Sequence, residues 1–319
     1  MKSVRWFEIL ALTALVLTGG CHSSGTALNP PTAVIPARIY FANASNASDG
    51  FPGSILVFKL PFGSNVAPLV TLAPPADFAN PFGLALDGNE RLFVGFTHIE
   101  EIFAYKLPLT VASTAEFQIA TPAGTAEALA VDGSGNLMAG IVNSIYVYAA
   151  PLSGSSTASF NFLLPNGNHC CLAELAVHGD TLAVATLTGF TDHIYLYSLP
   201  LTSTSTPTAS ITTSATQGYS GVAFDANGNL YASGVTPSQI EIYDPPFSNA
   251  STPVTTISTS SLTTDPGDLA FDSQGNLYFA GTFPGQLYEF TPPFSGASTP
   301  AAQTTIGLGQ LNVGIAIGK

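Results

Sequence analysis

The sequence predicts an all-β fold, a six-bladed β-propeller in which four-stranded blades close into a ring. The first observation is a phrase that returns every 45 to 47 residues. Its two best copies are Gly-Val-Ala-Phe-Asp at 221–225 and Asp-Leu-Ala-Phe-Asp at 268–272, each followed after two residues by Gly-Asn-Leu-Tyr. A fixed period of this length is typical of repeat architectures, and short strands separated by turn residues favour blades.

The second observation is that one repeat unit is split between the two ends of the chain. Residues 38–42, Arg-Ile-Tyr-Phe-Ala, match the second strand of a unit, and no first strand precedes them. Residues 314–318, Gly-Ile-Ala-Ile-Gly, match only a first strand. We therefore expect a C-terminal strand to complete the N-terminal blade and close the ring, whereas a linear solenoid would cap both ends. A double-sheet sandwich would not explain the even spacing.

Each unit is expected to contain four strands. The first is apolar, and its central position is always alanine, which suits the crowded centre of a ring: Ala85, Ala130, Ala176, Ala223, Ala270 and Ala316. An Asp-x-x-Gly-Asn turn follows, in which Asp bonds nearby backbone and Gly supplies a positive φ. The third strand alternates, as at 240–243, and the fourth is Thr-rich, as at 254–257. Thr favours strands and nearby Pro protects an edge, so the fourth strand is expected outermost.

The N-terminus predicts export. Lys2 and Arg5 precede a short apolar core at 9–17, which is typical of a signal peptide and too short to span a bilayer. Gly-Gly-Cys at 19–21 resembles the lipobox of bacterial lipoproteins, although Thr18 stands where Leu is usual. The expected organisation is a signal peptide at 1–20, a lipidated Cys21 with a tether at 21–36, and the propeller at 37–319. This places the protein in the bacterial cell envelope, lipid-anchored, or secreted if Cys21 is not modified; His22 after the Cys favours the outer membrane in a Gram-negative host.

The charge balance excludes one class of partner. The formal net charge is −13, and after Cys21 the basic residues are Arg38, Lys59, Arg91, Lys106 and Lys319. A nucleic-acid surface needs clustered Lys and Arg, so none is expected. The sequence holds no Walker or dinucleotide glycine motif, and no cofactor is expected. The expected partner is an envelope or extracellular ligand or protein, with membrane contact only through the lipid anchor.

Candidate site residues stand where the repeat is broken by polar side chains. Glu127, Glu174, Asp268 and Asn312 lie at or near the start of inner strands, where other units have small residues. Non-repeated polar groups at one mouth of the ring would suit a ligand site, and polar residues of solvated loops are the alternative. No catalytic residue is assigned.

His169, Cys170 and Cys171 form a second candidate, just before another inner strand. In an oxidising compartment the adjacent cysteines favour a disulfide, and two reduced thiols are the alternative. A metal site is disfavoured because zinc is bound by four tetrahedral ligands, and adjacent residues rarely supply two of them. The turn residues Asp87, Asp132, Asp225 and Asp272 each offer one carboxylate, whereas a calcium loop needs several oxygens. They are therefore expected to shape turns.

The phrase Gly-Val-Ala-Phe-Asp-x-x-Gly-Asn-Leu-Tyr resembles the NHL repeat, and the resemblance covers residues 38–319. It implies a six-bladed scaffold on which many functions occur. Similar proteins include calcium- or zinc-dependent lactonases of the gluconolactonase type, which hold the metal with Glu, Asn and Asp from separate inner strands, and streptogramin lyases. Neither set of site residues has a residue-by-residue counterpart in this sequence. The preferred hypothesis is a non-catalytic ligand- or protein-binding scaffold, and a metal-dependent hydrolase or lyase is the alternative.

Overall fold

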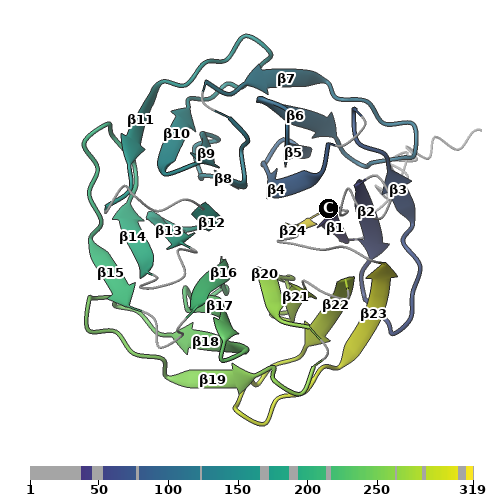
Figure 1. Ribbon diagram of the computed structural model, residues 1–319, viewed down its shortest axis with the longest axis vertical. Helices are drawn as coiled ribbons and strands as arrows, with labels where there is room; N and C mark the ends of the chain where they lie inside the picture. The colour runs from purple at the N-terminus through teal and green to yellow at the C-terminus, as the bar shows by residue number, and fades with distance from the viewer. Residues whose placement is uncertain are drawn as a thin grey trace, which may run out of the picture. The chain divides into compact units, whose positions relative to one another are not determined.

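The computed structural model describes residues 37–44, 53–76, 79–122, 124–165, 172–186, 193–212, 217–262, 264–281, 285–307 and 314–318. Residues Pro36–Lys319 form one compact unit, to which all described residues belong. Within them every regular element is a strand, and the strands form six four-stranded antiparallel sheets arranged in a ring (Figure 1). The prediction of a six-bladed β-propeller is confirmed. The described residues contain no helix that could cross a membrane.

The strands of each blade follow one another from the axis outward. Blade 1 contains β24 (Ile315–Gly318), β1 (Arg38–Asn43), β2 (Ser54–Lys59) and β3 (Val70–Leu72). Blade 2 contains β4 (Pro81–Leu86), β5 (Arg91–Phe96), β6 (Glu101–Lys106) and β7 (Phe117–Ala120). Blade 3 contains β8 (Ala128–Val131), β9 (Leu137–Ile141), β10 (Ser144–Tyr148) and β11 (Phe160–Leu163).

The second half of the ring repeats this order. Blade 4 contains β12 (Leu172–His178), β13 (Thr181–Thr186), β14 (His193–Ser198) and β15 (Ala209–Thr212). Blade 5 contains β16 (Gln217–Phe224), β17 (Leu230–Thr236), β18 (Gln239–Tyr243) and β19 (Thr255–Ser258). Blade 6 contains β20 (Pro266–Phe271), β21 (Leu277–Gly281), β22 (Gly285–Phe290) and β23 (Ala302–Gly307). The fourth strand of each blade is outermost, as predicted; β3, β15, β19 and β23 contain Thr, whereas β7 and β11 do not.

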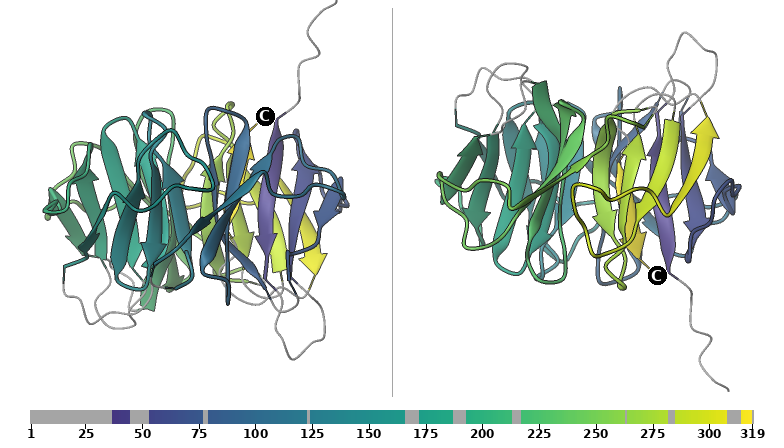
Figure 2. Two further views of the ribbon diagram at one scale, coloured as in Figure 1. Left: turned by 90° about the horizontal axis from the view of Figure 1, so that it is seen from above. Right: turned by 90° about the horizontal axis from the view of Figure 1, so that it is seen from below.

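The ring closes through the C-terminal strand. Strand β24 pairs antiparallel with β1, with Ile315 opposite Phe41 and Gly318 opposite Arg38. The N–H of Ala42 extends this ladder by donating to the carbonyl of Gly314 at 2.8 Å. The end of the chain therefore supplies the inner strand of the first blade, as the split repeat predicts (Figures 1 and 2).

The hydrophobic core lies between the blades. Among the described residues, the buried apolar side chains form six clusters, and each cluster fills one joint between neighbouring blades. At the joint between blades 1 and 6, for example, Phe41 and Phe58 pack against Tyr278 and Leu287. Both faces of each sheet are buried in this way, which explains why inner and central strands carry apolar residues on both sides.

The Asp turns are held by their own carboxylates. Asp132 Oδ1 accepts the N–H groups of Ser134 and Asn136, both at 2.9 Å, and Asn136 Nδ2 donates to Asp132 Oδ2 at 2.8 Å. The turns at Asp225 and Asp272 repeat this pattern. Gly135 has the positive φ of +83° that the turn requires. The prediction that these residues shape turns is confirmed.

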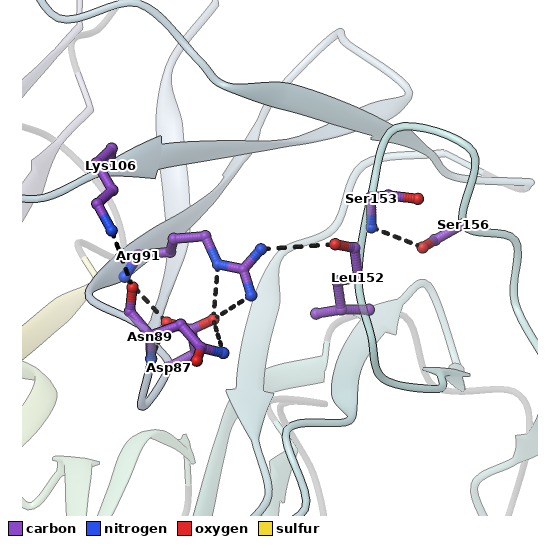
Figure 3. Close-up of polar contacts among 7 residues, drawn as sticks. All are labelled: Asp87, Asn89, Arg91, Lys106, Leu152, Ser153 and Ser156. Atoms are coloured by element: carbon purple, nitrogen blue, oxygen red, sulfur yellow. Dashed lines mark hydrogen bonds and ion pairs between the residues drawn. The ribbon is translucent and has the colours of Figure 1, made fainter.

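Blade 2 builds the same turn with different residues (Figure 3). Arg91 stands in place of the turn Asn, and its Nε donates to Asp87 Oδ2 at 2.8 Å. Its guanidinium also donates to the carbonyl of Leu152 in blade 3, at 3.5 Å, and lies over the rings of Phe93 and Phe117. One of the few basic residues is therefore used to fasten a turn and a blade joint.

Candidate functional site

The candidate site is built on one repeated position of the inner strands, four residues before the turn anchor. Small residues occupy it in four blades, and carboxylic acids occupy it in two: Gly83, Ala128, Glu174, Gly221, Asp268 and Gly314. The inner strands approach closely here. A Cβ added at Gly221 would lie 2.5 Å from the carbonyl oxygen of Gly267 and 2.6 Å from Asp268 Cα. The acids at 174 and 268 are therefore held in a crowded layer around the axis.

Four of the six inner strands are irregular at this layer. Register shifts fall beside Glu174 in β12 and Gly221 in β16, and between Pro81 and Leu84 in β4 and between Pro266 and Leu269 in β20. A bulge re-aims the side chains next to it. In blade 5, Ser220 Oγ donates to the carbonyl of Pro266 at 2.8 Å, and Ser233 Oγ donates to that of Gly267 at 2.6 Å. These bonds hold the segment that presents Asp268.

Glu174 and Asp268 are hydrogen-bonded to each other, although blade 5 separates their blades. Each is only 6% exposed. Asp268 accepts the N–H of Leu269 on Oδ1 at 2.7 Å and the N–H of Ile315 on Oδ2 at 2.8 Å. Glu174 Oε1 accepts the N–H of Leu175 at 2.9 Å. The pair thus links β12, β20 and the closing strand β24 around the axis (Figure 1).

The electrostatics assign a proton to this pair. Burial raises the pKa of Glu174 well above its usual range, and the neighbouring Asp268 raises it further. Burial also raises the pKa of Asp268, to about 7, while the N–H groups of Ile315 and Leu269 and the bond from Glu174 oppose the rise. When two carboxyl groups are in contact, ionisation of both is unfavourable because the two negative charges repel each other. Asp268 accepts two backbone N–H groups and Glu174 accepts one, so the negative charge is better stabilised on Asp268 and the shared proton is assigned to Glu174.

The structure describes three of the predicted site residues, Glu127, Glu174 and Asp268. It brings Glu174 and Asp268 together, and the alternative of solvated loop polarity is wrong for both because they are buried. Glu127 is half-buried just before β8, where its N–H donates to the carbonyl of Gly140 at 3.0 Å. Burial is the cause that raises the pKa of Glu127. Cys21, His169, Cys170, Cys171 and Asn312 lie outside the described residues.

The sequence interpretation missed Ser220 and Ser233. The available signal was weak: Ser233 stands where the second strand of other blades has Gly or Ala, at Gly95, Gly140, Ala185 and Ala280. That substitution keeps the side chain small and adds one hydroxyl. Its partner is a backbone carbonyl on another blade, which no local pattern identifies.

The lactonase resemblance implies a divalent metal, and the described residues do not fit one. Within the described ranges no group of three or more His, Cys, Asp or Glu side chains gathers as a metal site. Three of the four oxygens of Glu174 and Asp268 already accept backbone N–H groups.

Comparisons with known proteins agree on the fold. No protein-family model matches the chain, and no curated protein matches its sequence. A protein of unknown function from Bacteroides caccae superposes with a TM-score of 0.61 at 11% identity, covering 88% of this chain and 99% of that one. A periplasmic gluconolactonase from Pseudomonas aeruginosa superposes with a TM-score of 0.58 at 16% identity, covering 84% of this chain and 83% of that one. A protein from Lactobacillus plantarum superposes with a TM-score of 0.60 at 18% identity, covering 85% of this chain and 83% of that one.

The likeness is one of fold. At these identities the superpositions establish a shared six-bladed β-propeller and no shared chemistry.

Proposed function

We propose that the protein is an envelope-anchored, NHL-like propeller lipoprotein that binds a ligand or protein without catalysing a reaction. The observation that carries this proposal is how the two acids near the axis, Glu174 and Asp268 (the central acids), are bonded. Glu174 and Asp268 bond each other and the backbone of three inner strands. A general acid or base must instead reach a substrate proton. The pair serves as an internal connection between blades.

The ring itself suits a scaffold. The six blades have the same four-stranded order, so the repeated residues serve packing, and the side chains that differ between blades remain for recognition. The leader-like segment at 1–20 and Cys21 support tethering at the envelope. The periplasmic location of the gluconolactonase with the same fold supports the same compartment.

The second candidate is a metal-dependent lactonase, which the fold similarity to that gluconolactonase favours. Hydrolysis of D-glucono-1,5-lactone, measured with added Ca²⁺ or Zn²⁺, tests the two candidates. The scaffold proposal expects the rate of the uncatalysed control. A metal-stimulated rate that falls in Glu174→Gln would overturn it and establish the lactonase.

The anchor is tested separately. Expression of the full chain in a bacterial host with radiolabelled palmitate should label the wild type and place it in the membrane fraction. Cys21→Ser should abolish both. An unlabelled wild type recovered in the soluble fraction would contradict the lipid anchor.

A further inference from the structure

A groove lies at the joint between blades 4 and 5, apart from Glu174 and Asp268. It has a volume of about 380 Å³ and lies at the end of β12 opposite to Glu174. Blade 4 contributes His178, Thr181 and Thr208, and blade 5 contributes Phe224, Asn227 and Phe247. This volume falls within the range of small-molecule pockets, roughly 300–1,000 Å³.

The repeat supplies an internal comparison for this groove. The equivalent joint between blades 3 and 4 holds a cavity of about 120 Å³, lined in part by Asp132, Asn136 and Ser159. His178 and Thr181 replace Asp132 and Asn136, and Thr208 replaces Ser159. The groove is therefore larger where the turn phrase is broken.

The physical reason lies in the turn. In blade 3, Asn136 bonds Asp132 and its Oδ1 accepts the N–H of Ala150 at 3.0 Å, which fastens the turn to the neighbouring hairpin. In blade 4, His178 pairs directly with Thr181 across a two-residue hairpin loop, and the carbonyl of Asp180 accepts the N–H of Leu199 at 2.9 Å. The turn is therefore still fastened to the neighbouring hairpin, by backbone instead of by an Asn side chain. The missing Asn side chain and the deleted residue leave more space at the joint with blade 5.

The lining combines aromatic faces with neutral polar groups. The rings of His178 and Phe224 are 5.7 Å apart, and those of Phe224 and Phe247 are 6.3 Å apart. Thr181 and Asn227 add a hydroxyl group and an amide, and the Thr208 hydroxyl, which donates to the carbonyl of Leu196 at 3.0 Å, adds a hydrogen-bond acceptor. The described residues that line the groove include no Asp, Glu, Lys or Arg, in a chain whose net charge is −13.

We propose that this groove binds a neutral sugar ring. The apolar C–H face of a pyranose packs against aromatic rings, and its hydroxyl groups exchange hydrogen bonds with hydroxyl and amide side chains. A charged ligand would be buried without an ion-pairing partner, which is unfavourable. At the turn position His178 replaces the Asp of blade 3, so this position adds no carboxylate to the groove lining, and the exposed Asp180 of the same loop is not among the lining residues. The site goes beyond the proposed scaffold function, because it lies apart from the central acids.

Ligand-observed NMR of the purified wild-type protein tests the proposal. The probes are methyl α-D-glucopyranoside, methyl β-D-galactopyranoside, N-acetyl-D-glucosamine, D-glucuronate and phenol. At least one neutral sugar should bind saturably, and D-glucuronate should bind at least tenfold more weakly. Binding of phenol without any neutral sugar would assign the groove to purely aromatic ligands and overturn the proposal, as would binding of none of the probes.

Two variants locate the binding. Phe247→Leu keeps the fold, because Leu109, Leu152 and Leu201 occupy the same repeat position, and it should weaken sugar binding about threefold to tenfold by removing an aromatic face. Phe294→Leu makes the same change one blade further on and should leave binding unchanged. Thr208→Val should weaken binding, and its counterpart Ser159→Ala should not. Equal affinities in all four variants would overturn the site.

The result of the sugar-binding experiment can be distinguished from the result of the test of the scaffold proposal. Lactone hydrolysis that depends on Glu174 would overturn the scaffold and leave the groove standing. Loss of sugar binding in Glu174→Gln as well as in Phe247→Leu would place the sugar elsewhere and overturn the groove.

Discussion

Glu174 and Asp268 form a buried carboxyl pair that connects inner strands two blades apart. Glu174 donates the proton, and Asp268 accepts it together with two backbone N–H groups. The pair can exist because the intervening blade has Gly221 at the same position, where a Cβ would meet the backbone of blade 6.

Amide substitutions should distinguish the two partners. In Glu174→Gln, the amide can accept from Leu175 and donate to Asp268, so stability at pH 7 should be nearly unchanged. Asp268→Asn offers one acceptor to the two N–H groups of Leu269 and Ile315, and an unsatisfied buried donor costs about 1–3 kcal/mol. Urea unfolding measures both. A Gln variant as unstable as the Asn variant would contradict the assignment of the proton to Glu174, and a Gln variant less stable than the Asn variant would reverse it.

The free energy of unfolding should fall as the pH rises through the raised pKa values of Glu174 and Asp268. The pKa of Asp268 is raised to about 7 and that of Glu174 is raised above its usual range, so the folded protein holds protons that the unfolded chain releases above about pH 4. This stabilisation is complete below the unfolded pKa values and is lost through pH 7. Each proton contributes a slope of about 1.4 kcal/mol per pH unit.

The comparison with Glu174→Gln isolates this effect. Burial also raises the pKa of Glu127 and Glu289, and these groups contribute with the same sign in both proteins. The wild type should therefore lose stability more steeply than the Gln variant between pH 5 and 7. Parallel curves from urea unfolding at each pH would contradict the shared proton.

Because blades 5 and 6 approach closely at Gly221, we expect that a side chain at this position destabilises the protein. Gly221→Ala forces a Cβ against the backbone of Gly267 and Asp268, and overpacking of this kind costs about 1–3 kcal/mol. Gly133→Ala is the control, because a Cβ there meets no atom within 4 Å and its φ is not positive. Thermal unfolding compares the two variants, and equal stabilities would show that the inner strands can separate freely.

The closing strand predicts a large effect from a short deletion. Removal of residues 311–319 takes away β24, leaves the inner side of β1 unpaired and removes the Ile315 N–H from Asp268. The melting temperature should fall sharply. An unchanged melting temperature would mean that the ring does not need this strand.

The Arg turn of blade 2 predicts a partial rescue. Arg91→Ala removes the bonds to Asp87, one of which is the ion pair at 2.8 Å. Arg91→Asn restores the amide that bonds Asp132, Asp225 and Asp272 in other blades, so it should be more stable than the Ala variant by about 1 kcal/mol. Urea unfolding of both variants checks this, and equal losses would show that the Asp87 bond adds nothing.

Much of the fold was accessible from the sequence, and little of the site was. The number of blades, the outermost place of the fourth strands and the Asp turns follow from patterns within one period. The closing strand follows from matching the two ends of the chain. Glu174 and Asp268 were recognised as breaks in the repeat. Their contact was not predicted, since it crosses a blade, nor was the opening of the groove beside His178.

The sequence by itself determined the repeat, its count and the turn chemistry, because these depend on residues close together along the chain. The tertiary structure decided which breaks in the repeat act together. Curvature of the ring and bulges in β12 and β20 bring Glu174 to Asp268, and burial there makes the pair hold a proton. Burial and distance between blades are properties of the closed ring, and no local segment contains them.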